Sequence, residues 1–253
     1  MMSVLKKNKK KIFFIIVLIV AVTAYVFNPY KLEYVGYQSK VWAHRVNSLE
    51  KLNYTQKFYK GIELDLVFDS INNTFDVNHP PAESVNLNLD TYFSKISDKD
   101  LKLWLDFKNL SEINAEKSAE ILDQLTKKYS LKNENILVES TEMHNLKTFK
   151  NKGFKTSFYL PPLVGLTDEN KLVPTIDSIK QLLIQYPTSG ISCNVNAYDV
   201  IKEYFKEEKK YLWHIYKPYS RHQVKNYQDF RKYVSDPTVE AILIQVALSV
   251  GNR

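Results

Sequence analysis

Three short segments of this 253-residue chain carry side chains suited to metal-assisted chemistry on a phosphodiester. They are His44-Arg45-Val46-Asn47, then Glu63-Leu64-Asp65 with His79 downstream, then Asp106-Phe107-Lys108. Carboxylates hold divalent cations, a cation and a lysine offset the charge of a phosphate, and histidines transfer protons. These segments are the strongest indication of function in the sequence.

The spacing within the segments predicts that the acids share one side of a strand. Glu63 and Asp65 are two residues apart, and so are Asp106 and Lys108, which places each pair on one face of an extended chain. Taken singly, these patterns also fit a solvated strand face or an exposed ion pair. However, the segment Ile62 to Phe68 is otherwise apolar, so both acids would point into a barrel if the leucines pack outward. Inward-facing carboxylates repel each other unless they are protonated or bind a cation, so the joint pattern favours a site.

The elements that must position these residues alternate between short strands and longer helices. Eight strands are expected at residues 41–46, 61–68, 101–107, 135–139, 155–160, 190–194, 211–216 and 239–245, with a short extra strand at 74–78. Helices are expected at 48–59, 87–96, 115–129, 141–151, 174–186, 198–208 and 221–234. This order predicts a (β/α)8 TIM barrel, in which the carboxyl ends of the strands face the active-site mouth. A doubly wound sheet is the alternative, but the chain has six glycines and no G-x-G-x-x-G turn.

The first 30 residues read as a membrane anchor or signal segment, which leaves residues 31–253 for the barrel. Five lysines precede an apolar run from Ile12 to Val22 that continues to Phe27. We expect a single transmembrane helix with a cytoplasmic N-terminus and the barrel on the non-cytoplasmic side. A signal peptide cleaved near Val22-Thr23-Ala24 is the other interpretation, and it would give a secreted or periplasmic protein.

Charge and cysteine content narrow the function further. The formal charge is +7, but the five tail lysines account for most of it and leave the rest near +2. A broadly basic nucleic-acid-binding surface is therefore poorly supported. Cys193 is the only cysteine, so no intrachain disulfide forms, and its apolar surroundings in the sequence predict a buried structural thiol. The sequence gives no oligomeric state.

The order His-Arg, Glu-x-Asp, His, acid-x-Lys resembles that of glycerophosphodiester phosphodiesterases and other phospholipase-C-like phosphodiesterase barrels. The menorin-like branch is the most similar, through His44-x-Val46-Asn47-Ser48, His79-Pro80-Pro81 and Leu105-Asp106-Phe107-Lys108. Similar elements also occur in spider-venom-type phospholipases D. The resemblance covers residues 41–110. The chain departs from ordinary glycerophosphodiesterases in three ways: Asp106 replaces the usual Glu, no glycine follows His44-Arg45, and the last strand lacks a Thr-Asp ending.

The resemblance implies a role for each residue of the three segments. One divalent cation, Mg²⁺ or Ca²⁺, would bind Glu63, Asp65 and Asp106. His44 and His79 would act as acid and base in an order that the sequence does not assign, and Lys108 would stabilise the transition state. Arg45 and Asn47 are candidates to contact the phosphate or to support the metal-binding acids.

The implied substrate is a phosphodiester of glycerophosphodiester or lysophospholipid type, cleaved by hydrolysis or by attack of a neighbouring hydroxyl that yields a cyclic phosphate. A nuclease-type phosphodiesterase and a catalytically silent barrel that acts as a binding module are the alternatives. Outside the three segments, Glu139 is a candidate further ligand or acceptor, and Tyr159 and Trp213 are candidates to line the pocket.

Overall fold

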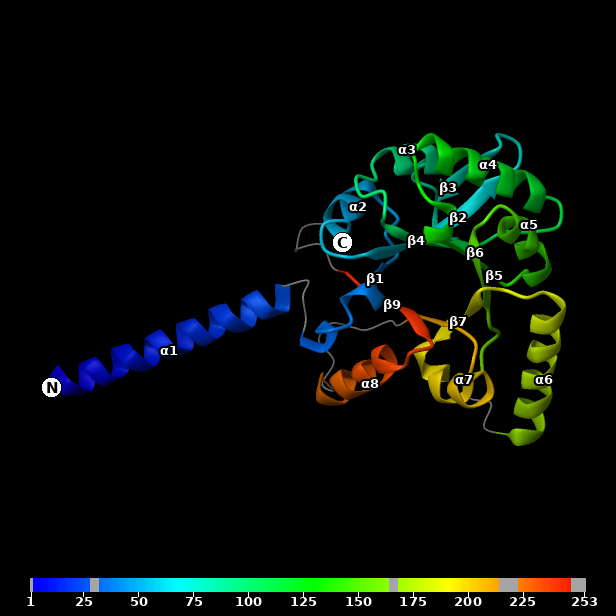
Figure 1. Ribbon diagram of the computed structural model, residues 1–253. Coiled ribbons are helices and arrows are strands. Elements are labelled where there is room, and N and C mark those ends of the chain that lie inside the picture. Colours follow the sequence, from blue (N-terminus) through cyan, green and yellow to red (C-terminus); the bar gives the residue numbers. More distant parts are fainter. Residues whose placement is uncertain (1, 28–31, 164–167, 214–222, 247–253) are drawn as a thin grey trace.

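The computed structural model describes residues 2–27, 32–163, 168–213 and 223–246 (Figure 1). Eight parallel strands form a closed ring with helices outside it, which confirms the predicted barrel. The ring closes because β1 pairs with β9 on one side and with β2 on the other. Its strands are β1 (Val41–His44), β2 (Gly61–Asp69), β4 (Lys102–Phe107), β5 (Ile136–Ser140), β6 (Lys155–Tyr159), β7 (Gly190–Asn194), β8 (Lys210–Trp213) and β9 (Val239–Gln245).

A ninth strand, β3 (Thr74–Val77), forms where the short extra strand is expected and pairs antiparallel with β2. The side chain of Asn109, which follows β4, fastens this hairpin to the barrel. Its Nδ2 donates to the carbonyl of Phe68 at 2.9 Å, and its Oδ1 accepts from the amide of Phe68 at 2.8 Å. The hairpin carries the chain to His79.

A helix forms in each predicted helical segment, with differences at the ends. The predicted 174–186 helix begins five residues earlier, because the side chain of Asp168 accepts from the Asn170 amide and caps the first turn. Residues 214–222 lie outside the described residues. They include the end of the expected strand 211–216 and the start of the expected helix 221–234. The helices around the barrel are α2 (Leu49–Thr55), α3 (Leu89–Ser94), α4 (Ala115–Lys128), α5 (Leu146–Asn151), α6 (Glu169–Gln185), α7 (Tyr198–Tyr204) and α8 (Gln223–Ser235).

Short 3₁₀ helices connect several of these elements. They are η1 (Leu32–Tyr34), η2 (Gln38–Lys40), η3 (Asn133–Asn135), η4 (Met143–Asn145) and η5 (Val195–Ala197). The first of them docks on α8, since the ring of Tyr34 lies 5.3 Å from that of Phe230 and Arg231 donates to the carbonyl of Val35 at 2.6 Å. The chain therefore enters β1 against the last helix of the barrel.

The strands bury both of their faces, in two separate apolar clusters. Leu64 and Leu66 belong to the large cluster that the helices cover, as the sequence pattern requires if the acids between them point inward. The inside of the ring is filled by a second cluster comprising Trp42, Trp104, Leu137, Tyr211, Ala241 and Leu243. Cys193 is a buried free thiol, and burial raises its pKa to about 12.

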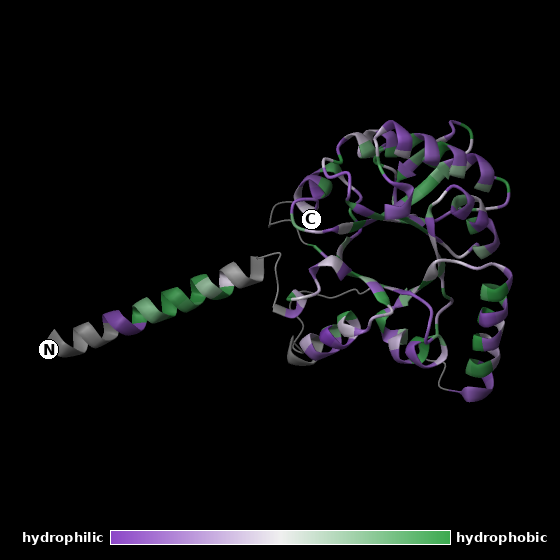
Figure 2. Ribbon diagram, in the orientation of Figure 1, coloured by the Kyte–Doolittle hydropathy of each residue, from purple (hydrophilic) through white to green (hydrophobic). Residues whose placement is uncertain are grey.

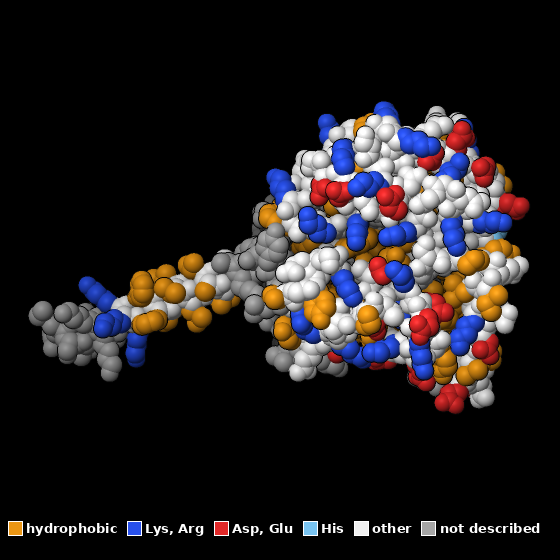
Figure 3. Space-filling view, in the orientation of Figure 1, with side chains coloured by type: hydrophobic (Ala, Val, Ile, Leu, Met, Phe, Trp, Pro, Cys, Tyr) orange, Lys and Arg blue, Asp and Glu red, His pale blue; other side chains and the backbone are white. Residues whose placement is uncertain are grey.

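Helix α1 (Met2–Phe27) precedes the barrel, with lysines near its start and apolar side chains exposed along its middle (Figures 2 and 3). Within the part of the chain that the structure describes, no helix combines the length and the apolar character needed to span a membrane. The predicted transmembrane helix is therefore not supported. Even when counted on to Phe27, the apolar run that begins at Ile12 is shorter than the ~20 residues that a spanning helix needs.

Candidate active site

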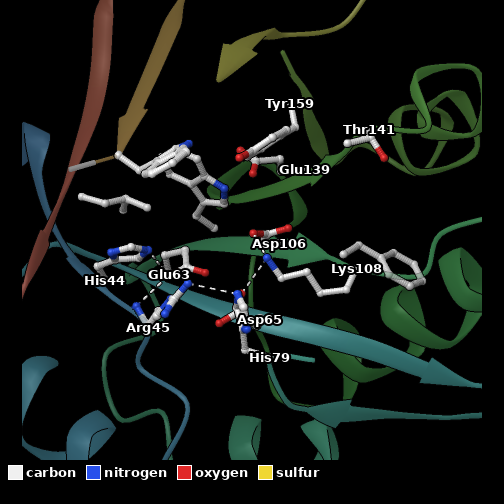
Figure 4. A pocket seen from close by; sticks show the side chains of 14 residues that line it. His44, Arg45, Glu63, Asp65, His79, Asp106, Lys108, Glu139, Thr141 and Tyr159 are labelled. Atoms are coloured by element: carbon white, nitrogen blue, oxygen red, sulfur yellow. Dashed lines mark hydrogen bonds and ion pairs between the residues drawn. The ribbon is translucent and has the colours of Figure 1, made fainter. Parts of the chain in front are cut away.

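Three carboxylates meet inside the carboxyl end of the barrel. Asp65 of β2 lies opposite Asp106 of β4 in the strand register, and Glu63 precedes Asp65 by two residues on the same face. One oxygen from each of the three lies within 4.8 Å of the others, and Figure 4 shows the side chains converging. Glu63 and Asp65 are 2% and 1% exposed, so water screens their mutual repulsion poorly.

One lysine partly offsets this concentration of negative charge. Nζ of Lys108 lies 2.9 Å from Oδ1 of Asp65 and also contacts Oδ2 of Asp106. Burial lowers the pKa of Lys108, but the Asp106 and Asp65 carboxylates outweigh it, and the pKa lies above its usual value. Burial, together with Asp65 and Asp106, raises the pKa of Glu63 well above its ordinary value. Burial also raises the pKa of Asp106, even with Lys108 beside it.

The donor set fits a divalent cation. Three carboxylate oxygens close together are the hard ligands that Mg²⁺ and Ca²⁺ prefer, and a single lysine does not balance three acids. The raised pKa of Glu63 shows that its charged form is disfavoured without further positive charge. The cluster could therefore hold one such ion through Glu63, Asp65 and Asp106.

A tight turn at the end of β1 brings the first segment onto Glu63. Arg45 has a positive φ of 51°, and its amide donates to Oε2 of Glu63 at 2.6 Å. Lys51 in α2 holds this turn from outside, because its Nζ donates to the carbonyls of His44 at 2.7 Å and of Arg45 at 2.8 Å. The hydroxyl of Tyr92 donates to the carbonyl of Val46 at 2.7 Å.

Asn47 joins the first segment to the second through a reciprocal pair of hydrogen bonds. Its Nδ2 donates to Oδ2 of Asp65 at 2.6 Å, and its Oδ1 accepts from the Asp65 amide at 3.0 Å. The side chain of Asn47 is thus committed to orienting an acid. Of the two roles expected for Asn47, the structure shows the contact with a candidate metal-binding acid.

Both predicted histidines line the same pocket as the acids. Nε2 of His44 lies 3.6 Å from Oε2 of Glu63, and its buried Nδ1 has no hydrogen-bond partner among the described residues. Burial and the nearby Arg45 lower the pKa of His44 to about 4, so its imidazole is neutral at pH 7. Nε2 of His79 lies 3.0 Å from Nη2 of Arg45. Because a guanidinium only donates, Nε2 of His79 must be the acceptor.

The pocket has a volume of about 200 Å³ and a second wall opposite the acids. The three residues that the sequence offered only as further candidates all lie on this wall: Glu139, Tyr159 and Trp213. The rings of Tyr159 and Trp213 stack with centroids 6.2 Å apart and planes 12° apart. Four lining residues were not predicted: Trp104, Phe107, Thr141 and Leu243. Strand alternation would have placed Trp104 and Leu243 inside the ring.

Lys51 and Tyr92 were also missed by the sequence reasoning. Neither carries a motif, and both act on backbone carbonyls of the β1 turn. Their role depends on where α2 and α3 pack, which local sequence does not reveal. The eight predicted site residues are all close together in the structure, in or beside one pocket.

Comparison with known proteins finds no match among protein-family models or among curated proteins. Solved structures do match. A glycerophosphodiester phosphodiesterase from Parabacteroides distasonis has a TM-score of 0.57 at 15% identity, covering 81% of this chain and 92% of that one. The corresponding enzyme from Thermotoga maritima has a TM-score of 0.54 at 14% identity, covering 81% and 93%.

A third structure is an Oleispira antarctica phosphodiesterase in complex with the product sn-glycerol-3-phosphate. Its TM-score is 0.57 at 12% identity, with 83% of this chain and 94% of that one covered. The chain thus has the barrel fold found in glycerophosphodiester phosphodiesterases, over nearly the whole of those proteins.

Proposed function

We propose that this protein is a metal-dependent phosphodiesterase of the glycerophosphodiesterase-like superfamily. One observation carries the proposal. The carboxyl ends of β1, β2 and β4 bring three carboxylates, a lysine and a histidine into one pocket, and His79 joins them from the segment after β3. The shared fold with glycerophosphodiester phosphodiesterases supports it.

Each side chain has a part in the proposed reaction. Glu63, Asp65 and Asp106 would hold one Mg²⁺ or Ca²⁺, which when bound supplies positive charge to a phosphate oxygen. Lys108 stabilises the negative charge that develops on the phosphoryl oxygens. Arg45, beside His79, binds the phosphate and orients that imidazole by donating to its Nε2.

The two histidines move the protons. His44 is neutral at pH 7, so one of its ring nitrogens can accept a proton. Nε2 of His79 becomes able to accept one when Arg45 turns from it to the phosphate. One takes a proton from the attacking hydroxyl or water, and the protonated form of the other delivers one to the leaving oxygen. The attacking group is a neighbouring hydroxyl of the substrate, or water in a direct hydrolysis.

The proposed branch of the superfamily and the proposed substrates rest on the sequence motifs. Asp106 in place of Glu, together with His44-x-Val46-Asn47 and His79-Pro80-Pro81, supports a place near the menorin-like branch. The proposed substrates are glycerophosphodiesters or lysophospholipids.

The proposal is tested by turnover of the purified full chain. We expect cleavage of bis(p-nitrophenyl) phosphate and of a lysophospholipid, lost with chelator and restored by Mg²⁺ or Ca²⁺. Asp65→Asn should lower kcat at least a hundredfold, since it removes charge from the cluster. Turnover that survives both treatments contradicts the metal role. Preference for short oligonucleotides indicates a nuclease, and absence of turnover with all phosphodiesters indicates a binding module.

We also propose that residues 1–30 direct the barrel out of the cytoplasm. Five lysines followed by an apolar helix support this orientation. Full-length protein expressed with a C-terminal tag should be degraded by protease added to spheroplasts. A tag protected in intact spheroplasts but cleaved after lysis places the barrel in the cytoplasm and contradicts the proposal. The mass of the mature chain shows whether the segment is removed.

A further inference from the structure

The wall opposite the acid cluster contains buried polar atoms that the proposed reaction does not use. Glu139, near the end of β5, is 1% exposed, and its Oε2 has no hydrogen-bond partner among the described residues. The indole nitrogens of Trp104 and Trp213 are likewise buried and without a partner there. All three residues line the pocket. Leaving several buried polar atoms unpaired costs free energy, so their presence in one cavity points to a ligand that pairs them.

Glu139 stands apart from the cluster that fits a cation. Its Cα pairs with that of Asp106 across the β4–β5 ladder, yet its oxygens are not within the 4.8 Å grouping formed by Glu63, Asp65 and Asp106. Burial and the nearby Asp106 raise the pKa of Glu139, and Ser192 hydrogen-bonds its carboxyl group. Figure 4 shows Glu139 next to Tyr159, across the pocket from His44 and Arg45. The carboxyl group of Glu139 therefore lines the pocket outside the group of acids that fits a cation.

We propose that Glu139 and the stacked rings of Tyr159 and Trp213 form a subsite for one ester arm of the substrate, an arm that carries an O–H or N–H donor. This inference rests on the proposed function, because it takes the phosphate to lie at the acid cluster. The donor of the arm pairs with Oε2 of Glu139, and its carbon chain packs along the aromatic faces.

The chemistry of the wall sets what this arm can be. A carboxyl oxygen accepts a hydrogen bond, while two indole N–H groups donate to oxygen atoms of the arm or of the phosphate. A short polar arm such as 2-hydroxyethyl or 2-aminoethyl satisfies these groups, whereas a purely alkyl arm leaves Glu139 buried and unpaired. Sites built to hydrogen-bond a substrate group discriminate strongly against analogues that lack it.

The test measures binding, so that it does not depend on turnover. Three monoesters of methylphosphonate, with 2-hydroxyethyl, 2-aminoethyl or n-propyl arms, are titrated calorimetrically into the full chain with Mg²⁺. We expect one or both donor arms to bind about tenfold or more tightly than n-propyl, the effect of pairing one buried polar atom. In Glu139→Leu, this preference should fall to about twofold or less. Thr141→Val, altered on the same wall, should keep it.

Glu139→Gln keeps the shape of the side chain and serves if Glu139→Leu does not fold. It should weaken binding of 2-aminoethyl, because an ammonium pairs with a carboxylate and not with an amide, and leave binding of n-propyl unchanged. An equal effect on all three arms contradicts the inference. Equal binding of all three arms by the wild type overturns the inference. So does a loss of Mg²⁺ affinity in both Glu139 variants, which would make Glu139 a metal ligand. Donor preference without turnover of any phosphodiester would instead refute the proposed function alone.

Discussion

Glu63 is held from two sides while it faces two other acids. The Arg45 amide donates to its Oε2, and Nε2 of His44 lies 3.6 Å from the same oxygen. These contacts fix the direction of the carboxyl group but do not neutralise the repulsion from Asp65 and Asp106, which adds to burial in raising its pKa. The three carboxylates are therefore arranged to bind a cation, and this arrangement lowers the stability of the metal-free protein.

A Glu63→Gln variant should separate these two effects. Gln keeps an oxygen for the Arg45 amide and removes one buried charge, so the chelated variant should be more stable than the chelated wild type by roughly 1 to 3 kcal/mol. Thermal melts in EDTA and in millimolar Mg²⁺ or Ca²⁺ measure this. The wild type should gain melting temperature from the ion and the variant little or none. A variant that is less stable in EDTA would contradict this account of the cluster.

His44 should make the protein sensitive to acid. Burial and Arg45 hold its folded pKa at about 4, against about 6.5 in an unfolded chain. Between these values the unfolded state binds more protons, so stability is fully present above pH 6.5 and falls as the pH drops toward 4. The loss amounts to about 3 kcal/mol. Urea unfolding of wild type and His44→Gln at pH 4, 5, 6 and 7, with chelator, should show a shallower slope in the variant; parallel slopes would refute the assignment.

At the scale of elements, the β2–β3 hairpin is an addition to the barrel that positions His79. Antiparallel pairing carries the chain back along β2, and the Asn78 amide donates to the carbonyl of Asp65 at 3.1 Å. The next residue is His79, whose Nε2 lies 3.0 Å from Arg45. The imidazole therefore depends on a connection outside the eight-stranded ring.

Removing the Asn109 fastener should loosen this hairpin. Asn109→Ala deletes both hydrogen bonds to Phe68, at a cost of about 1 to 3 kcal/mol. Amide hydrogen exchange should accelerate in Thr74–Val77, and kcat should fall while Mg²⁺ affinity stays the same, because the part of β2 that carries Glu63 and Asp65 remains paired with β4 over Gly61–Leu66. Asn72→Ala at the hairpin tip, where the side chain bonds Asp69, is the control. Unchanged exchange in β3 would show that the pairing with β2 suffices.

The order of elements was predictable because each strand is a short apolar run and most helices carry an apolar stripe. The convergence of the acids followed from two-residue spacing and from the shared edge of parallel strands. The turn at Arg45 was not predictable, since an arginine gives no signal for positive φ. The hydrogen bonds that Lys51 donates depend on that turn. The early start of α6 depends on one capping aspartate, Asp168.

At the scale of the whole molecule, closure of the ring depends on close approach between β1 and β2. A Cβ added at Gly61, the first residue of β2, would lie 2.1 Å from Cδ2 of Trp42. The indole of Trp42 is 4% exposed inside the barrel and is fixed by its Nε1 donating to the carbonyl of Ser39 at 2.9 Å. The ring has no room for a side chain at this position.

Gly61→Ala should therefore destabilise the entire barrel. We expect a loss of about 1 to 3 kcal/mol, typical of overpacking a buried site, seen as a lower melting temperature with a single transition. Lys60→Ala, which alters the exposed neighbour, is the matched control and should melt like the wild type. Equal melting temperatures for all three proteins would mean that the indole can move without cost.

The pocket has two walls that come from different stretches of the chain. The acids, Lys108 and both histidines belong to residues 44–108, whereas Glu139, Tyr159 and Trp213 belong to β5, β6 and β8. Among the described residues, no side-chain hydrogen bond or ion pair joins these three residues to the acids. Charge still links the two walls, because Asp106 and Glu63 add to burial in raising the pKa of Glu139. Exchanging the second half of the barrel between relatives would therefore change what the pocket accepts and, through Glu139, the charge balance of the acid cluster.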